Sequence, residues 1–121
     1  MAEYVKFEVP AELSGKQASV IEKAAKSGKI RIGSNEVTKA VERGEAKLVV
    51  IAGDVEPPEI VMHLPVLCGE RKIQYSYMPT KKELGEKAGV KVGTAAIAIV
   101  DEGEQKKDFE DLVKKLGEVA K

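Results

Sequence analysis

Apolar residues along the chain follow two spacings, one typical of helices and one typical of strands. Spacings of three and four residues predict amphipathic helices, whereas short uninterrupted or alternating apolar runs predict strands. The helical patterns cover residues 11–27, 34–44, 60–64, 80–89 and 109–120. The strand patterns cover residues 29–32, 48–52, 73–78 and 95–100. Helices and strands therefore alternate from residue 11 onward, which predicts a three-layer α/β/α sandwich formed as a single domain by residues 1–121.

Local signals mark several element boundaries. Thr80 and Glu83 have the spacing of a capping box at the start of a helix. Pro65 is expected to interrupt the apolar stretch before it, so that residues 66–71 form a separate turn or helix. Residues 48–52 and 95–100 are wholly apolar and are predicted to be strands covered on both faces. Glycines stand where three helical patterns stop, at Gly28, Gly44 and Gly89.

The composition fits a folded protein. Of 121 residues, 43% are hydrophobic and 33% are charged, which is typical of globular rather than disordered chains. No apolar run reaches the roughly 18 residues of a membrane span, and the first residues lack the apolar region of a signal peptide. The single cysteine, Cys68, can form neither an internal disulfide nor a thiolate zinc site. We therefore expect a cytoplasmic protein without membrane contact, metal or cofactor.

The net charge is zero, but the charges are unevenly distributed. Residues 14–47 sum to +4, as do residues 71–91, whereas residues 48–70 contain four acidic residues and no Lys or Arg. If the fold brings these two basic segments together, a neutral protein acquires a basic face that can contact phosphates. The alternative is a solvated mosaic of charges without a partner.

The only asparagine lies at the start of the second predicted helix. Ser34 is expected to be the N-cap, which places Asn35, Glu36 and Lys39 in the opening turns after a strand. Free amides at a helix start attract phosphate, and amide, carboxylate and ammonium groups can meet the edges of bases. The alternative is an ordinary capped and exposed helix start, where Glu36 favours the helix dipole.

A second candidate is the loop of residues 88–93. It follows a predicted helix that carries several lysines and precedes a buried strand. Val90 and Val92 are flanked by glycines and can press against unstacked bases if they are exposed. In the alternative, both valines fold back onto the core.

The evidence for an enzyme is weaker. His63 and Cys68 are a candidate thiol–imidazole pair, but both lie close to Pro65, where a structural role in a helix or turn is favoured. Asp54 follows a buried strand as the phospho-acceptor of a receiver domain does, yet the first strand, residues 29–32, supplies no acidic cluster. No phosphate-loop, dinucleotide-binding or nucleophile-elbow motif occurs. A small α/β enzyme or phospho-receiver using Asp54 or His63 is therefore the alternative to a protein that binds nucleic acid.

Taken together, these segments resemble one family. Residues 33–44, 47–52, 54–61, 63–65, 81–85 and 88–90 are similar to the archaeal large-subunit ribosomal proteins of the L-seven-Ae (L7Ae) family. The similarity covers nearly the whole chain. It implies an α/β/α sandwich with a small mixed sheet. It also implies recognition of the RNA kink-turn, a sharply bent helix–bulge–helix with tandem sheared G·A pairs.

The resemblance implies roles for individual residues. Asn35 and Glu36 are expected to hydrogen-bond the guanines of the sheared pairs, with Lys39 supporting them from the same helix. Ser34 stands where the family usually has Thr and keeps the hydroxyl group. Phosphate contacts are expected from Lys29, Arg31 and Lys82.

The loop is also assigned a role by the resemblance. Its residues Val90, Lys91 and Val92 are expected to cover the flipped-out and stacked nucleotides of the bulge. Lys91 stands where the family often has an acidic residue, and Gly93-Thr94 also departs from the usual run. These departures affect the selectivity of the loop rather than the recognition of G·A pairs.

The function implied by the resemblance is a non-catalytic scaffold. The family acts in the large ribosomal subunit, in box C/D and H/ACA small ribonucleoproteins, which guide ribose methylation and pseudouridylation, and in archaeal ribonuclease P. Expected partners are kink-turns in ribosomal RNA, guide RNAs and ribonuclease P RNA, and proteins of the small ribonucleoproteins. The acidic segment 54–59 with Ile60 is a candidate surface for protein partners. The free chain is expected to be a monomer.

Overall fold

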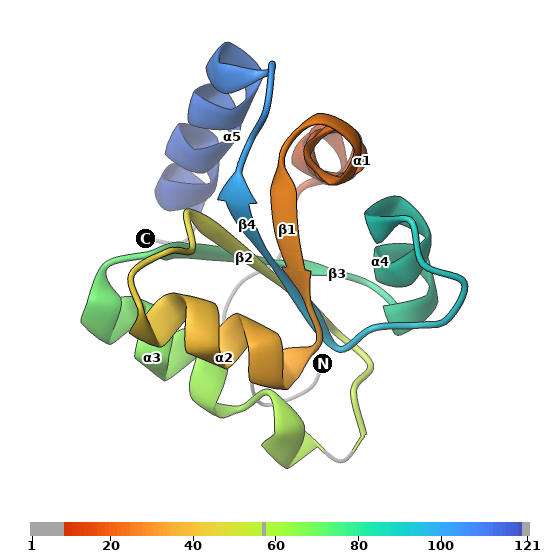
Figure 1. The fold of residues 1–121 in the computed structure, drawn as a ribbon, viewed down its shortest axis with the longest axis vertical. Helices are drawn as coiled ribbons and strands as arrows, with labels where there is room; N and C mark the ends of the chain where they lie inside the picture. The colour runs from red at the N-terminus through yellow and green to blue at the C-terminus, as the bar shows by residue number, and fades with distance from the viewer. Residues whose placement is uncertain (1–8, 57, 120–121) are drawn as a thin grey trace.

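A mixed sheet of four strands lies at the centre of the described part of the chain. The computed structural model describes residues 9–56 and 58–119 (Figure 1). The strands are β1 (Lys29–Ile32), β2 (Leu48–Ala52), β3 (Gln74–Met78) and β4 (Ala96–Asp101), in the order β1-β4-β2-β3. The pair β2–β3 is parallel, and the pairs β1–β4 and β2–β4 are antiparallel. The small mixed sheet expected from the resemblance is thus confirmed.

Helices cover both faces of this sheet, as Figure 1 shows. One layer contains α1 (Ala11–Ser27), α4 (Lys81–Ala88) and α5 (Lys106–Val119), with α1 packed against both α4 and α5. The other contains α2 (Ser34–Glu42) and α3 (His63–Arg71), with the short 3-10 turn η1 (Pro58–Ile60) before α3. The predicted three-layer sandwich is confirmed. The predicted continuation of the last helix to Ala120 lies outside the described residues.

The two wholly apolar runs form the two inner strands. Every residue of β2 is buried, and so are the first four residues of β4. Because helices cover both faces of an inner strand, neither face carries polar side chains, as the continuous apolar pattern predicted. The buried residues form one hydrophobic core. Among the described residues, no helix is long and apolar enough to cross a membrane.

Several predicted helix ends are confirmed. The backbone N–H of Glu83 donates to Thr80 Oγ1 at 3.1 Å, so Thr80 caps α4. At the other end of α4, the N–H of Gly89 donates to Glu86 O and that of Val90 to Gly85 O, which closes the helix in a Schellman arrangement. Gly44, with a positive φ, directly follows Arg43, the C-cap of α2.

The prediction that Ser34 is the N-cap of α2 is wrong. The N-cap is Gly33, with φ 96° and ψ 147°, and Ser34 is the first helical residue. The chain turns from β1 directly into α2, and this turn requires a backbone conformation that is essentially restricted to glycine. The cap position therefore falls on a residue without a side chain, and no side-chain hydrogen bond caps α2.

The prediction that Pro65 separates two elements is also wrong. Helix α3 runs without interruption from His63 to Arg71, and Pro65 is its third residue. Proline is accepted in the first turn because the backbone N–H groups there have no partner within the helix. The apolar stretch 60–64, which predicted a helix, instead contains the end of η1, a turn and the first residues of α3.

Candidate nucleic-acid interface

Two backbone hydrogen bonds bring the starts of α2 and α4 to the same end of the sheet. The N–H of Gly33 donates to Ala96 O at 2.9 Å, and the N–H of Thr94 donates to Lys81 O at 3.1 Å. Residues 90–95 connect α4 to β4, so this loop lies between the two helix starts (Figure 1). We term residues 33–39, 81–82 and 90–95 the α2–loop edge. The two basic segments of the sequence therefore meet at this edge.

The start of α2 presents polar side chains to solvent. Asn35, Glu36 and Lys39 are exposed, whereas Val37 and Ala40 are buried against the sheet. This division follows from the helical period, which directs the apolar residues to the core and the polar ones away from it. Lys39 Nζ lies 3.7 Å from Glu36 Oε1, and both side chains are more than half exposed. The pair holds the carboxylate and the ammonium group side by side without removing either from water.

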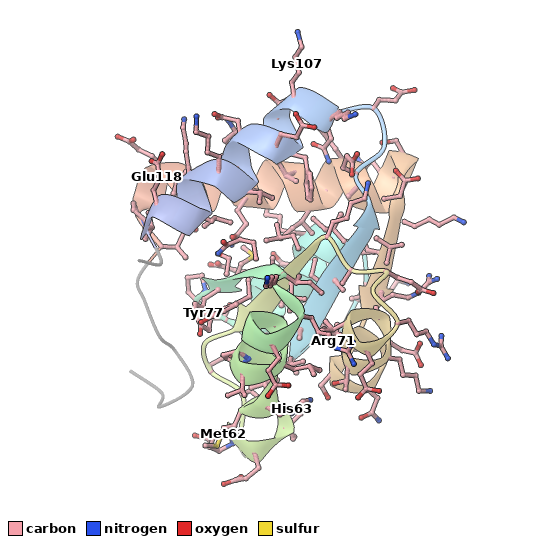
Figure 2. The ribbon with its side chains drawn as sticks, turned by 90° about the vertical axis from the view of Figure 1, so that its left-hand side faces the viewer. Met62, His63, Arg71, Tyr77, Lys107 and Glu118 are labelled. Carbon is pink, nitrogen blue, oxygen red and sulfur yellow. The ribbon has the colours of Figure 1, made fainter. Side chains whose placement is uncertain are left out.

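Two consecutive hydrogen bonds link the start of α2 to the start of α3. Thr38 Oγ1 donates to the carbonyl oxygen of Ser34 at 2.7 Å, and His63 Nε2 lies 2.8 Å from Thr38 Oγ1. Since the only proton of the Thr38 hydroxyl goes to Ser34 O, His63 Nε2 must be the donor in the second bond. Figure 2 shows His63 at the start of α3. Sequence reasoning missed this role of Thr38, because the pairing joins positions on separate helices and leaves no local signal.

The predicted cationic residues are not all brought to the edge. Lys82 lies in the first turn of α4, and Lys91 lies in the loop, both exposed. Arg31 is half-buried and pairs with Ala98 two positions before Gly33. Lys29 begins β1, about 13 Å from the edge at the usual strand rise. Within the described residues, no ion pair involves any of Lys29, Arg31, Lys82 and Lys91.

The loop of the α2–loop edge exposes one of its two valines. Val92 is 72% exposed and is followed by Gly93, whereas Val90 is half-buried. The alternative in which both valines fold back onto the core is therefore wrong for Val92. A single exposed apolar side chain is common on protein surfaces, so Val92 points to a contact only together with the exposed lysines near it.

The residues proposed for an enzyme have structural contacts instead. Asp54 Oδ1 accepts a hydrogen bond from the Lys81 N–H at 2.8 Å, so Asp54 caps the start of α4. Burial raises the pKa of the Cys68 thiol to about 12, which leaves it without thiolate character at neutral pH. His63 bonds to Thr38 rather than to Cys68, since residues five apart on a helix point in directions about 140° apart. The described residues contain no group of three metal-ligating side chains.

The structure is that of a small α/β/α sandwich protein with a mixed sheet. Polar side chains, two lysines without an ion pair among the described residues and an exposed valine gather at one edge of that sheet. Residues 16–109 match the family described as Ribosomal protein L7Ae/L30e/S12e/Gadd45, and the chain belongs to this family. Its structure is similar to that of the Giardia lamblia 15.5kD RNA binding protein, with a TM-score of 0.84 and 31% sequence identity, over 98% of this chain and 97% of that one. The family and this relative indicate a non-enzymatic protein.

Proposed function

We propose that the chain binds RNA kink-turns through the α2–loop edge. The observation that carries this proposal is that Asn35 and Glu36 are exposed at the start of α2, which no side chain caps and where the two basic segments meet. The Giardia relative is named an RNA binding protein, which supports RNA as the ligand. Both side chains are exposed, and within the part of the chain that the structure describes the one ion pair of Glu36 is with Lys39.

Each group at the start of α2 has a chemical task in this proposal. The Asn35 amide offers a donor and an acceptor side by side, which suits the edge of a base. The Glu36 carboxylate accepts hydrogen bonds from the imino and amino groups of guanine, which sheared G·A pairs leave accessible. Lys39, 3.7 Å from Glu36, offsets the repulsion between that carboxylate and the RNA phosphates. A Watson–Crick pair occupies the guanine groups itself, so the site discriminates against regular helices.

Binding favours the bent form of the RNA. A kink-turn brings phosphates of two helical arms close together, and the cations at the edge reduce their repulsion. Lys82 and Lys91 are available for this because no carboxylate among the described residues pairs with them. A protein that binds only the bent form shifts the equilibrium of the RNA toward it by differential affinity. Val92 covers bulge nucleotides that have left the stack.

We propose that the scaffold also recruits proteins through a second surface. A hollow of about 440 Å³ between α2 and α3 is lined by Thr38, Glu42, His63, Val66, Leu67 and Glu70. Val66 of this lining is 61% exposed, and Ile60 and Met62, which precede α3, are 40% and 39% exposed (Figure 2 labels Met62). The apolar patch thus extends past Ile60, the residue expected from the sequence, onto α3. Its carboxylates and the absence of Lys and Arg in residues 48–70 favour a partner with basic and apolar side chains.

These partners define the proposed setting. Kink-turns of ribosomal RNA, box C/D and H/ACA guide RNAs and ribonuclease P RNA are the proposed ligands, which would place the protein in the cytoplasm as a monomer before assembly. Sequencing of the RNA recovered with the tagged protein from cells tests this list. Enrichment of RNAs without kink-turns would contradict it.

One titration tests the proposed activity. A kink-turn RNA is compared with a version whose sheared G·A pairs are replaced by Watson–Crick pairs, using the native chain, Asn35→Ala and Glu36→Ala. Loss of one base contact costs about 1–3 kcal/mol, so each variant should bind the kink-turn about 5- to 150-fold more weakly. Glu118→Ala, at an exposed position of α5 in the other helical layer, is the control and should bind normally. Equal affinity of the native chain for both RNAs would refute the proposal.

A further inference from the structure

The loop of the α2–loop edge rests directly on the backbone of α4 at a glycine. Gly85 is a buried residue of α4, and a Cβ at this position would lie 2.2 Å from the carbonyl oxygen of Val92 and 3.1 Å from its carbonyl carbon. Both neighbours are backbone atoms, so a rotamer change cannot relieve the contact. The helix and the loop can take this arrangement only if position 85 has no side chain.

Three further contacts fasten the same loop. Its first N–H, from Val90, donates to Gly85 O at 3.0 Å, and the N–H of Thr94 donates to Lys81 O at 3.1 Å. The two accepting carbonyls are one helical turn apart, so the loop runs back along a single turn of α4. Gly93 lies close to that turn as well, because a Cβ there would be 3.0 Å from Lys81 Cβ. Both ends and the middle of the loop are therefore fixed to α4.

These contacts with α4 determine where the side chains of the loop lie. The carbonyl of Val92 faces α4, while its side chain is 72% exposed and Lys91 is exposed beside it. Gly85 itself is buried and cannot touch a ligand. Any group added at position 85 must push the Val92 backbone outward from the helix. The distance between Val92 and the start of α2 would then change, although no exposed residue had been altered.

We propose that Gly85 is a positioning residue that sets how the Lys91–Val92 segment meets the unpaired nucleotides of the RNA bulge. This inference rests on the proposed kink-turn binding. It assigns the selectivity of the loop partly to a buried position of α4, in addition to the exposed residues of the loop. The start of α2 does not depend on position 85, since Gly33 is fastened to β4 through Ala96.

The test uses two RNAs and two glycine variants. One RNA is a complete kink-turn, and the other has abasic sites in place of the bulge nucleotides but keeps the sheared G·A pairs. Gly85→Ala should bind the complete RNA about tenfold more weakly than the native chain, because the contacts to the bulge bases are misplaced. It should bind the abasic RNA as the native chain does. Gly15→Ala, at an exposed helical glycine of α1 with no atom within 4 Å of the added methyl group, should match the native chain on both RNAs.

A second variant keeps the proposal testable if Gly85→Ala does not fold. Gly93→Ala introduces a milder contact, since its Cβ would lie 3.0 Å from Lys81 Cβ and 3.3 Å from the Lys81 carbonyl carbon. It should lose less affinity than Gly85→Ala, and for the complete RNA only. Positioning by Gly85 is refuted if Gly85→Ala binds both RNAs as tightly as the native chain, or if it loses the same affinity for both. The same two outcomes for Gly93→Ala refute it if Gly85→Ala does not fold. A native chain that does not bind the complete kink-turn would instead refute the proposed function. NMR amide shifts should change in residues 90–94 and stay constant in residues 34–39.

Discussion

A methyl group added at Gly33 tests the backbone turn that directs α2. Gly33 has φ 96° and ψ 147°, and apart from Gly33 itself and its two chain neighbours no residue has an atom within 4 Å of an added Cβ. The substitution Gly33→Ala therefore creates no collision, and its whole cost comes from the backbone conformation. Residues other than glycine in this region lose about 1–3 kcal/mol. Since small domains are stable by about 5–15 kcal/mol, this loss is readily measured.

The measurement is urea unfolding followed by circular dichroism, with the native chain and Gly69→Ala for comparison. Gly69 lies within α3, and an added Cβ there also has no atom within 4 Å. The same methyl group should stabilise this variant by about 0.5–1 kcal/mol, because alanine is the better helix former. The two variants are thus expected to change the free energy of unfolding in opposite directions. If Gly33→Ala is as stable as the native chain, the turn into α2 and the geometry of the edge derived from it are wrong.

Three further predictions concern stability and reactivity. Asp54→Ala removes one of the two side-chain hydrogen bonds that cap the start of α4 and leaves the bond from Thr80, so it should lower the free energy of unfolding by about 1 kcal/mol. Glu56→Ala, at an exposed neighbouring position, should leave it unchanged in the same assay. The hydrogen-bonded ion pair with Lys47 lowers the pKa of Glu102 from its usual 4.5, so this pair stabilises the fold above that pH and is lost as the pH falls through the native pKa. Urea midpoints measured from neutral to acidic pH should therefore fall less steeply for Glu102→Gln than for the native chain, and parallel curves would contradict this reasoning. Cys68, buried and with a pKa of about 12, should react with a thiol reagent only after unfolding, and rapid labelling of the native chain would show that its burial is wrong.

The sequence predicted the elements well where burial alone decides the pattern. The continuous apolar runs of β2 and β4 and the three-and-four spacing of α2 identify elements whose faces are set by the core. Pro65 was misread because its effect depends on the exact helical position, which apolar spacing does not define. The sequence favours Ser34 as the N-cap of α2 because serine has the stronger capping preference. The turn from β1 instead requires a backbone conformation that glycine adopts readily, so the N-cap is Gly33.

The candidate site could be predicted residue by residue but not as an assembly. Asn35 and Glu36 carry a local signal, since they are polar groups at a helix start. Their proximity to the loop depends on the pairing of Gly33 with Ala96, which are 63 positions apart in the sequence. Gly85 carries only a faint signal, a glycine on the buried face of a helix where alanine would be the better helix former.

The position of β4 in the sheet has a consequence for the synthesis of the chain. β4 comes last among the described strands but lies between β1 and β2, so among these strands β1 has no pairing partner until residues 96–101 exist. A nascent chain that ends before residue 96 can form the parallel β2–β3 pair but leaves the inward edge of β2 open. Closure of the sheet therefore waits until residues 96–101 have been translated. A ribosome stalled before that point would display the open edge of a wholly apolar strand to chaperones.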